Sequence, residues 1–369
     1  MNKIRINKND LVVCIFFFLI SFCKGLGLNN SNDYYLLIYF GGIIFATLKL
    51  FKVRFNRREI LLLLLIILIG MLDYVFGNET TILFTGITLF FLKNIDLKYI
   101  IKALFLGRLL GFLLMIIFPI IGIIPMNTMK FYRAGLFIER YAFGYSHPNL
   151  MHSTFNIIVI MWLYLYYDKI KFKNFVFFEI INYLIYRYTF SRTGFIILTL
   201  SLMISYISKI NKKIQNKLPK LLNFTFIFSF LLGIIFAIGY EKWDFINKID
   251  ILLTGRIKYT SILINNYIPP IIKTKEYTGI LFDNGYFDLL YNGGILATIW
   301  FVIMQIKTNN YINKNSLHKE ALLIIILFVY SITESYYISS VMNVGIFFLS
   351  YSIFEFSKQN NKKNVIDKK

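Results

Sequence analysis

The chain has 369 residues, of which 57% are hydrophobic and only 16% are charged. A soluble globular protein is closer to half apolar and a quarter charged, so this composition excludes an ordinary soluble enzyme and indicates an integral membrane protein. The net charge of +21 does not indicate a nucleic-acid-binding protein. The Lys and Arg residues form short clusters between apolar runs, and no single basic domain gathers them.

Apolar runs of about 17–25 residues, separated by short polar segments, are typical of an all-α polytopic membrane protein. We expect a bundle of about twelve transmembrane helices, near residues 10–29, 34–51, 60–76, 79–93, 103–124, 148–167, 174–189, 194–209, 221–240, 285–306, 320–338 and 339–357. The fourth run is short for a hydrocarbon core of about 30 Å, so the third and fourth runs also fit a re-entrant pair. The first run lacks a small-residue cleavage site, which favours a spanning helix over a signal peptide.

The basic residues predict the orientation of the chain. With the N-terminus inside, every inner segment is basic, and the inner segments hold most of the 40 Lys and Arg residues. We therefore predict a multi-pass protein of the cytoplasmic membrane with both termini in the cytoplasm and a cytoplasmic tail at 358–369. Two sizeable external loops remain, at about 125–147 and 241–284. Neither is long enough to build its own core, so we expect one transmembrane domain over 1–369.

Four arginines fall on the predicted outer face, where the positive-inside bias disfavours them. Arg133 and Arg140 lie in the first external loop, Arg192 lies in the short turn "TFSRTG", and Arg256 lies in "LLTGRIKY" of the second loop. The planar fork of arginine binds two phosphate oxygens at once. Arginines at these positions therefore indicate a site for a phosphate.

Three predicted helices begin beside these arginines. Pro148 stands in the first turn of one helix, Ser191 can cap the helix near 194, and Asp283 or Asn284 can cap the helix at 285. All three helices run inward, so their partially positive N-terminal ends face outward and favour an anion. Arginines and helix ends together predict an outward-facing site, at the membrane boundary, for a lipid-linked or polyanionic phosphate.

Five segments, in this order and on this topology, resemble the Wzy-type polysaccharide polymerases, which belong to the wider O-antigen polymerase and ligase group. They are "RYAFGYSHPN", "FSRTG", "LLTGRIKY", "DNGYFDLLYNGGI" and "ITESYYISSVMN". The resemblance covers roughly residues 100–350, and the residues before 100 match in hydropathy alone. It implies a GT-C-like membrane glycosyltransferase that is metal-independent and uses no cofactor.

The resemblance also implies a reaction at the external face of the membrane, in capsule, exopolysaccharide or O-antigen synthesis. A growing glycan is transferred from undecaprenyl pyrophosphate to the non-reducing end of a new lipid-linked repeat unit. A sugar hydroxyl attacks the carbon at the reducing end, and lipid pyrophosphate leaves. The implied partners are the undecaprenyl-pyrophosphate-linked donor and acceptor oligosaccharides and membrane lipids, with a flippase and a chain-length regulator as further candidates.

Four residues are the predicted catalytic group. Arg140 and Arg192 would stabilise charge on the leaving pyrophosphate. His147 would be the general base, since a pKa of about 6.5 suits proton abstraction at neutral pH. Glu334, near the outer end of a span, would pair with an arginine. The alternatives are aromatic stacking or snorkelling at the headgroup level for Arg140, and a lipid-phosphate anchor for Arg192. For His147 they are a helix cap or a hydrogen bond to the acceptor sugar, and for Glu334 a structural salt bridge.

The predicted substrate-binding residues are Arg133, Arg256, Asn149, Asp283, Asn284 and Tyr286. Asp283 is also a rival base, with helix capping as its alternative. His152, about one turn deeper than His147, is predicted to be a hydrogen-bonded residue of the bundle.

Two other functions remain open at this point. One is an O-antigen-ligase-like transferase that moves finished glycan onto another acceptor. The other is a flippase or exporter of lipid-linked oligosaccharide, which should carry charges through a central cavity and often has internal repeats. This sequence gathers its special polar residues on one face and has no repeat, which favours the enzyme.

Overall fold

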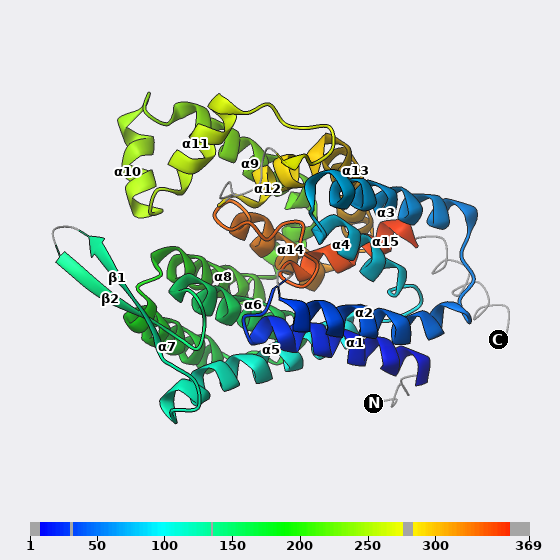
Figure 1. Cartoon of the computed structure of the whole chain (residues 1–369), viewed down its shortest axis with the longest axis horizontal. Coiled ribbons are helices and arrows are strands. Elements are labelled where there is room, and N and C mark those ends of the chain that lie inside the picture. The colour runs from blue at the N-terminus through cyan, green and yellow to red at the C-terminus, as the bar shows by residue number, and fades with distance from the viewer. Residues whose placement is uncertain (1–7, 30–31, 134–135, 276–282, 355–369) are drawn as a thin grey trace. The chain divides into compact units, whose positions relative to one another are not determined.

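The structure is a computed structural model that describes residues 8–29, 32–133, 136–275 and 283–354 (Figure 1). It is predominantly helical, as the sequence predicts for a membrane protein. The chain divides into two compact units, each made of two stretches of sequence. Unit 1 comprises Met1–Lys52 and Lys98–Gln215, and unit 2 comprises Val53–Leu97 and Asn216–Lys369.

Unit 1 contains helices and one β-hairpin. Its helices are α1 (Lys8–Gly25), α2 (Asp33–Leu50), α5 (Leu97–Ile120), α6 (Pro148–Tyr166), the short 3-10 helix η1 (Tyr167–Lys169), α7 (Phe172–Thr189) and α8 (Arg192–Ile210). Its strands are β1 (Asn127–Arg133) and β2 (Leu136–Phe143). Helix α6 is buried along most of its length and packs against α7 and α8.

Glycines bring α1 and α5 into backbone contact. A Cβ atom on Gly107 would overlap the carbonyl oxygen of Phe18, and a Cβ atom on Gly111 would meet the carbonyl oxygen of Phe22 at 2.5 Å. Small residues four apart on one helix face permit this close approach between membrane helices.

The hairpin is a departure from the expected all-α fold. Strands β1 and β2 pair antiparallel, with Lys130 opposite Glu139 and Tyr132 opposite Phe137. They occupy most of the external loop predicted at 125–147. The alternation of aromatic and polar side chains in this segment has the period of two that a strand requires.

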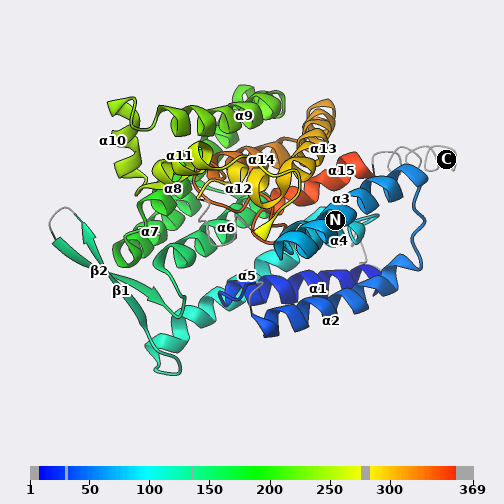
Figure 2. The same cartoon turned by 45° about the horizontal axis from the view of Figure 1, so that its top comes forward.

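Unit 2 is built from helices, several of them short. They are α3 (Arg57–Gly77), α4 (Thr81–Phe90), α9 (Lys212–Gly239, which starts at the end of unit 1), α10 (Asp244–Leu252), α11 (Arg256–Asn266), α12 (Gly285–Asn292), α13 (Gly294–Lys314), α14 (His318–Tyr330), the 3-10 helix η3 (Val344–Leu349) and α15 (Ser350–Ile353). Helices α10 and α11 occupy part of the loop predicted at 241–284. Figure 2 shows the same elements from a second direction.

Six helices among the described residues are long and apolar enough to cross a membrane. They are Asp33–Leu50, Arg57–Gly77, Leu97–Ile120, Pro148–Lys169, Arg192–Ile210 and Lys212–Gly239. This confirms a helical membrane protein. Helix α4 has only 10 residues, in agreement with the short fourth run in the sequence.

The helix expected over 285–306 is wrong as a continuous element, because the chain breaks between α12 and α13. Gly294 has φ of +72°, and a Cβ atom there would lie 2.6 Å from the carbonyl oxygen of Ile271. The first amides of α13 donate instead to the linker 267–275: Ile295 N to Pro270 O at 2.9 Å and Leu296 N to Ile271 O at 3.2 Å. This linker therefore caps α13 and fixes the break.

The helices expected over 320–338 and 339–357 are also wrong as continuous spans. Helix α14 ends at Tyr330, and residues 331–343 form irregular turns in which most residues are buried. The backbone of this segment finds partners within unit 2: Ser331 O accepts from Gly285 N at 2.7 Å, and Ile338 O accepts from Thr85 Oγ1 at 2.8 Å. Irregular backbone inside a membrane protein requires such partners.

Candidate functional site

The predicted site residues divide between the two units. Unit 1 carries Arg133, Arg140, His147, Asn149 and Arg192, and unit 2 carries Arg256, Asp283, Asn284, Tyr286 and Glu334.

Arg140 joins three elements of unit 1. Its Nε donates to the carbonyl oxygen of Thr189 at the end of α7 at 2.6 Å, and its Nη2 donates to Asn149 Oδ1 at the start of α6 at 2.5 Å. Its guanidinium also lies 5.9 Å from the ring centre of Phe131 in β1. Asn149, predicted to bind substrate, therefore orients Arg140. The guanidinium is half-buried and anchored at the meeting point of β2, α6 and α7.

His147 caps α6. Its Nδ1 accepts a hydrogen bond from the backbone amide of Asn149 at 3.1 Å, and Pro148 follows at the first helical position. A neutral imidazole has one accepting and one donating nitrogen, so this bond places the proton on Nε2. The accepting nitrogen that a general base needs is thus occupied by the cap. His147 is therefore a helix cap in the structure, which is one of the alternatives that the sequence leaves open.

Arg192 is the first residue of α8 and is half-buried. Its guanidinium has no hydrogen-bond or salt-bridge partner among the residues that the structure describes. Ser191 occupies the N-cap position of α8, as expected, but its side chain makes no capping hydrogen bond. A cation at an uncapped helix N-terminus favours an anion. The side chain of Arg133, at the end of β1, lies outside the described part of the structure.

His152 is confirmed as a hydrogen-bonded residue of the bundle. It is fully buried, its Nε2 lies 2.9 Å from Asn182 Oδ1, and its Nδ1 lies 3.2 Å from Thr189 Oγ1. Asn182 Nδ2 donates to the carbonyl oxygen of Phe195, so the amide oxygen faces His152 and accepts from Nε2. The same Thr189 accepts from Arg140 through its carbonyl oxygen. His152 therefore supports the residue that holds Arg140 and is not placed as a base.

In unit 2, Arg256 and Glu334 form a buried ion pair. The Nη1 atom of Arg256 lies 2.7 Å from Glu334 Oε1, and the two side chains are 8% and 11% exposed. The half-buried carboxylate of Asp283 acts electrostatically on both partners. Burial alone would lower the pKa of Arg256, but Glu334 and Asp283 hold it above its ordinary value. The pairing predicted for Glu334 with an arginine is thus confirmed, and the partner is Arg256.

Asp250, which the sequence analysis missed, positions Arg256. Its Oδ1 accepts from the backbone amides of Ile257 at 2.7 Å and Lys258 at 3.2 Å, which caps the N-terminus of α11. Gly255 precedes the helix with φ of +87°. An Asp five residues before a Gly-Arg pair is the local signal for this arrangement, and it is too weak to stand alone.

The predicted substrate-binding residues of α12 have different environments. Asn284 caps the helix as expected, with Oδ1 accepting from the amides of Tyr286 at 2.9 Å and Phe287 at 3.3 Å. Tyr286 is 1% exposed and donates its hydroxyl hydrogen to the carbonyl oxygen of Phe328 at 2.9 Å. The ring of Tyr286 is buried in the helix packing and its hydroxyl is occupied, which disfavours the predicted contact with substrate.

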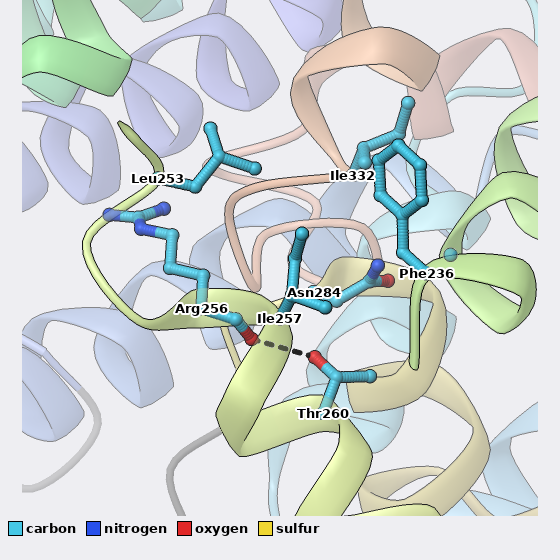
Figure 3. Close-up of a pocket in the computed structure, with 8 residues that line it drawn as sticks. Phe236, Leu253, Arg256, Ile257, Thr260, Asn284 and Ile332 are labelled. Carbon is cyan, nitrogen blue, oxygen red and sulfur yellow. Dashed lines mark hydrogen bonds between the residues drawn. The ribbon is translucent and has the colours of Figure 1, made fainter. Parts of the chain in front are cut away.

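A small pocket lies between α9, α11 and α12 (Figure 3). Its roughly 290 Å³ of empty space includes open solvent, so the enclosed part is much smaller than an ordinary small-ligand site. Figure 3 shows the guanidinium of Arg256 beside Leu253 and the amide of Asn284 beside Phe236, with Ile257 between them. The Nδ2 atom of Asn284 has no acceptor among the described residues. The pocket is thus mainly apolar, with Arg256, which is paired with Glu334, and Asn284 as polar groups at its wall.

The ion pair and the pocket lie where helices are interrupted. Glu334 belongs to the irregular segment 331–343, and Asn284 starts the short helix α12, whose first amide (Gly285) bonds to Ser331 O. Interrupted helices in membrane proteins place backbone and side-chain polar groups in a cavity. This part of unit 2 is therefore the best-formed candidate site among the described residues.

Across the described ranges, no three or more His, Cys, Asp or Glu side chains gather as a metal site, and we assign no metal ligand. Comparison of the chain with models of protein families, with curated proteins and with solved structures found no match.

Proposed function

We propose that the chain is a membrane glycosyltransferase that polymerises lipid-linked oligosaccharide repeat units on the outer face of the cytoplasmic membrane. It transfers the growing glycan from undecaprenyl pyrophosphate to the non-reducing end of a new lipid-linked repeat. The observation that supports this most is the Arg256–Glu334 pair, with Asp283 and the Asn284 pocket, at the interruption of two helices. Buried, paired charges in a membrane protein are costly and are usually retained for function.

In the proposed reaction, a hydroxyl of the acceptor sugar forms a bond to the anomeric carbon of the donor, and the bond from that carbon to pyrophosphate breaks. The hydroxyl proton passes to a carboxylate, and the lipid pyrophosphate leaves with its negative charge. Arg256 is suited to stabilise that charge, because it is held in place before the reaction and shielded from water. Glu334 orients Arg256 through the 2.7 Å contact.

Asp283 is the base that we favour. It is half-buried, close enough to act electrostatically on Arg256, and has no hydrogen-bond donor among the described residues. His147 is less suited, because its accepting nitrogen caps α6. A carboxylate can also stabilise the oxocarbenium-like carbon of the transition state.

Arg192 and Arg140 of unit 1 are the second part of the proposal. Arg192 offers a guanidinium without a partner among the described residues at a helix N-terminus, and Arg140 is anchored by two hydrogen bonds. We assign them to the binding of a phosphate of the lipid-linked substrates.

A flippase or exporter of lipid-linked oligosaccharide is the second candidate. The interrupted helices α12–α13 and α14–η3 favour it, because transporters often bind substrates at such interruptions. A ligase-like transferase would use the same groups as the polymerase and differ in its acceptor.

The proposal can be tested by deleting the gene in its host and restoring wild type, Arg256→Gln, Asp283→Asn or Lys258→Gln. Lys258 is exposed on α11, two residues after Arg256, and serves as the matched control. Lipid-linked glycan is separated on a gel, and the amount of each protein in the membrane is measured.

The polymerase predicts a ladder for wild type and Lys258→Gln, and single repeat units on the lipid carrier for the deletion, Arg256→Gln and Asp283→Asn. Intact polymer stranded on the lipid carrier after deletion would indicate a ligase. Repeat units trapped on the cytoplasmic side would indicate a flippase.

A further inference from the structure

The distal half of the β1–β2 hairpin exposes large aromatic side chains. Phe131, Tyr132 and Phe137 are 46%, 62% and 77% exposed. Tyr132 and Phe137 face each other across the two strands, with ring centres 5.1 Å apart. Figures 1 and 2 both show the hairpin extending away from the helices of its own unit. These rings are therefore not covered by the part of unit 1 that the structure describes.

The base of the hairpin is firmly anchored. Arg140 bonds to Asn149 and to the carbonyl oxygen of Thr189, and the rings of Tyr141 and Phe143 pack edge-on against Tyr188 of α7, with centres 6.2 and 5.7 Å apart. The residues that position Arg140 therefore also fix the base of the hairpin, and with it the position of Tyr132 and Phe137 at the distal end.

Exposed apolar side chains recur along the chain from a predicted membrane helix to the hairpin. Those on α5, on the connecting segment and on β1 are 40–62% exposed: Leu113, Ile117, Ile120, Ile121, Ile123, Met126, Met129 and Phe131. Helix α5 is one of the six candidate spans, so its exposed apolar residues face lipid in a membrane. The exposed apolar residues of the connecting segment, directly after this span, support a position of the hairpin beside the bilayer.

The side chains at the hairpin end suit the interface between lipid headgroups and acyl chains. Phe and Tyr rings at this level bury their apolar faces, while the Tyr hydroxyl stays near the headgroups. Lys130 lies opposite Glu139 in the strand pairing, so these two charges offset each other, and Arg133 and Arg140 leave residues 127–143 with a net charge of +2. Aromatic contact would supply the binding, and the arginines would add attraction to anionic lipid.

We propose that the distal hairpin inserts into the bilayer interface through Phe131, Tyr132 and Phe137, and so serves as a lipid-binding anchor for the region around Arg140. The partner is the phospholipid bilayer itself, with zwitterionic lipid sufficient. This proposal does not depend on the proposed enzymatic activity.

Spin labels at single cysteines test it in reconstituted full-length protein. Cys14 and Cys23 are both buried and are replaced by Ala to give the background. Nitroxides are attached at Tyr132→Cys and Phe137→Cys, with Lys258→Cys as an aqueous reference and Leu231→Cys, 48% exposed on α9, as a lipid reference. In vesicles of phosphatidylcholine, with and without phosphatidylglycerol, collision with oxygen is compared with collision with a water-soluble nickel complex loaded on both sides.

We expect the labels at 132 and 137 to lie about 5–10 Å below the lipid phosphates, between the two references, and to change little when phosphatidylglycerol is added. Labels that match Lys258→Cys would overturn the proposal, because the hairpin end would then be in water. Labels that are immobilised and shielded from both reagents would also overturn it, because a second copy or another protein would then cover the rings.

Discussion

The buried ion pair of unit 2 makes a quantitative prediction. Arg256 and Glu334 are both about nine-tenths buried, and their nearest atoms are 2.7 Å apart. At an effective dielectric constant of about 20, this attraction is about 6 kcal/mol before the cost of removing both charges from water. Removing one partner of such a pair typically destabilises a protein by about 3–5 kcal/mol, because the other charge is left buried alone.

Because of Asp283, the two single substitutions should lower the free energy of unfolding by different amounts. After Glu334→Gln, Arg256 still has the carboxylate of Asp283 nearby. After Arg256→Gln, Glu334 is left near Asp283 with no cation, so two like charges repel. We therefore expect a loss of about 3 kcal/mol for Glu334→Gln and about 5 kcal/mol for Arg256→Gln. The double variant should lose at least about 2 kcal/mol less than the sum of the two.

The free energy of unfolding can be measured by titrating SDS into detergent micelles and following helix content by circular dichroism. Lys258→Gln, at an exposed position of the same helix, should stay within about 0.5 kcal/mol of wild type. Additive losses in the double variant would refute the coupling between Arg256 and Glu334. Equal losses in the two single variants would refute the role given to Asp283.

Three further predictions use the same unfolding assay. Gly294→Ala should cost more than about 2 kcal/mol because of its positive φ and the nearby Ile271 oxygen, whereas Gly41→Ala, in α2 with open space around it, should be neutral or stabilising by up to about 1 kcal/mol; equal effects would contradict the capped break. His152→Phe should cost about 2–4 kcal/mol because its hydrogen-bond partners stay buried, and a smaller loss would contradict the network. Burial lowers the pKa of Lys273, so the folded protein binds this proton less tightly than the unfolded chain does, and the free energy of unfolding should rise as pH approaches 10.5; Lys273→Met should reduce that slope, and an unchanged slope would contradict the shift.

The sequence predicts the class of the fold and many helix starts. Helix α6 begins at Pro148 and α12 begins after Asn284, where capping residues mark them. The positions of α3, α7 and α8 also agree with the apolar runs, because a span of lipid demands a long apolar segment.

The interruptions of α12–α13 and α14–η3 could not be predicted from hydropathy. The break after Gly293 depends on carbonyl groups of the linker 267–275, which is distant in sequence. Residues 331–343 are turns because their backbone finds partners such as Gly285 and Thr85 elsewhere in unit 2. Tertiary partners of this kind leave no local pattern.

The sequence predicts which residues belong to the candidate site, but it does not predict which of them contact one another. The sequence indicates that Glu334 should pair with an arginine, and the structure identifies Arg256. The surroundings of two other predicted residues also could not be predicted. Tyr286 is buried by helix packing, and the Nδ1 atom of His147 caps α6. A sequence pattern shows neither the exposed fraction of a side chain nor which nitrogen of a histidine accepts a hydrogen bond.

The most direct test of the proposed function is a reaction with the purified protein. Wild type and Arg256→Gln are reconstituted in vesicles with the host's lipid-linked repeat unit and no other protein, and the products are separated by chain length. Our account predicts that wild type converts single repeat units into a ladder on the lipid carrier and releases one lipid pyrophosphate for each bond formed, whereas Arg256→Gln leaves single units. A wild-type protein that is folded and inserted, yet leaves the repeat units unjoined or only moves them across the bilayer, would contradict it.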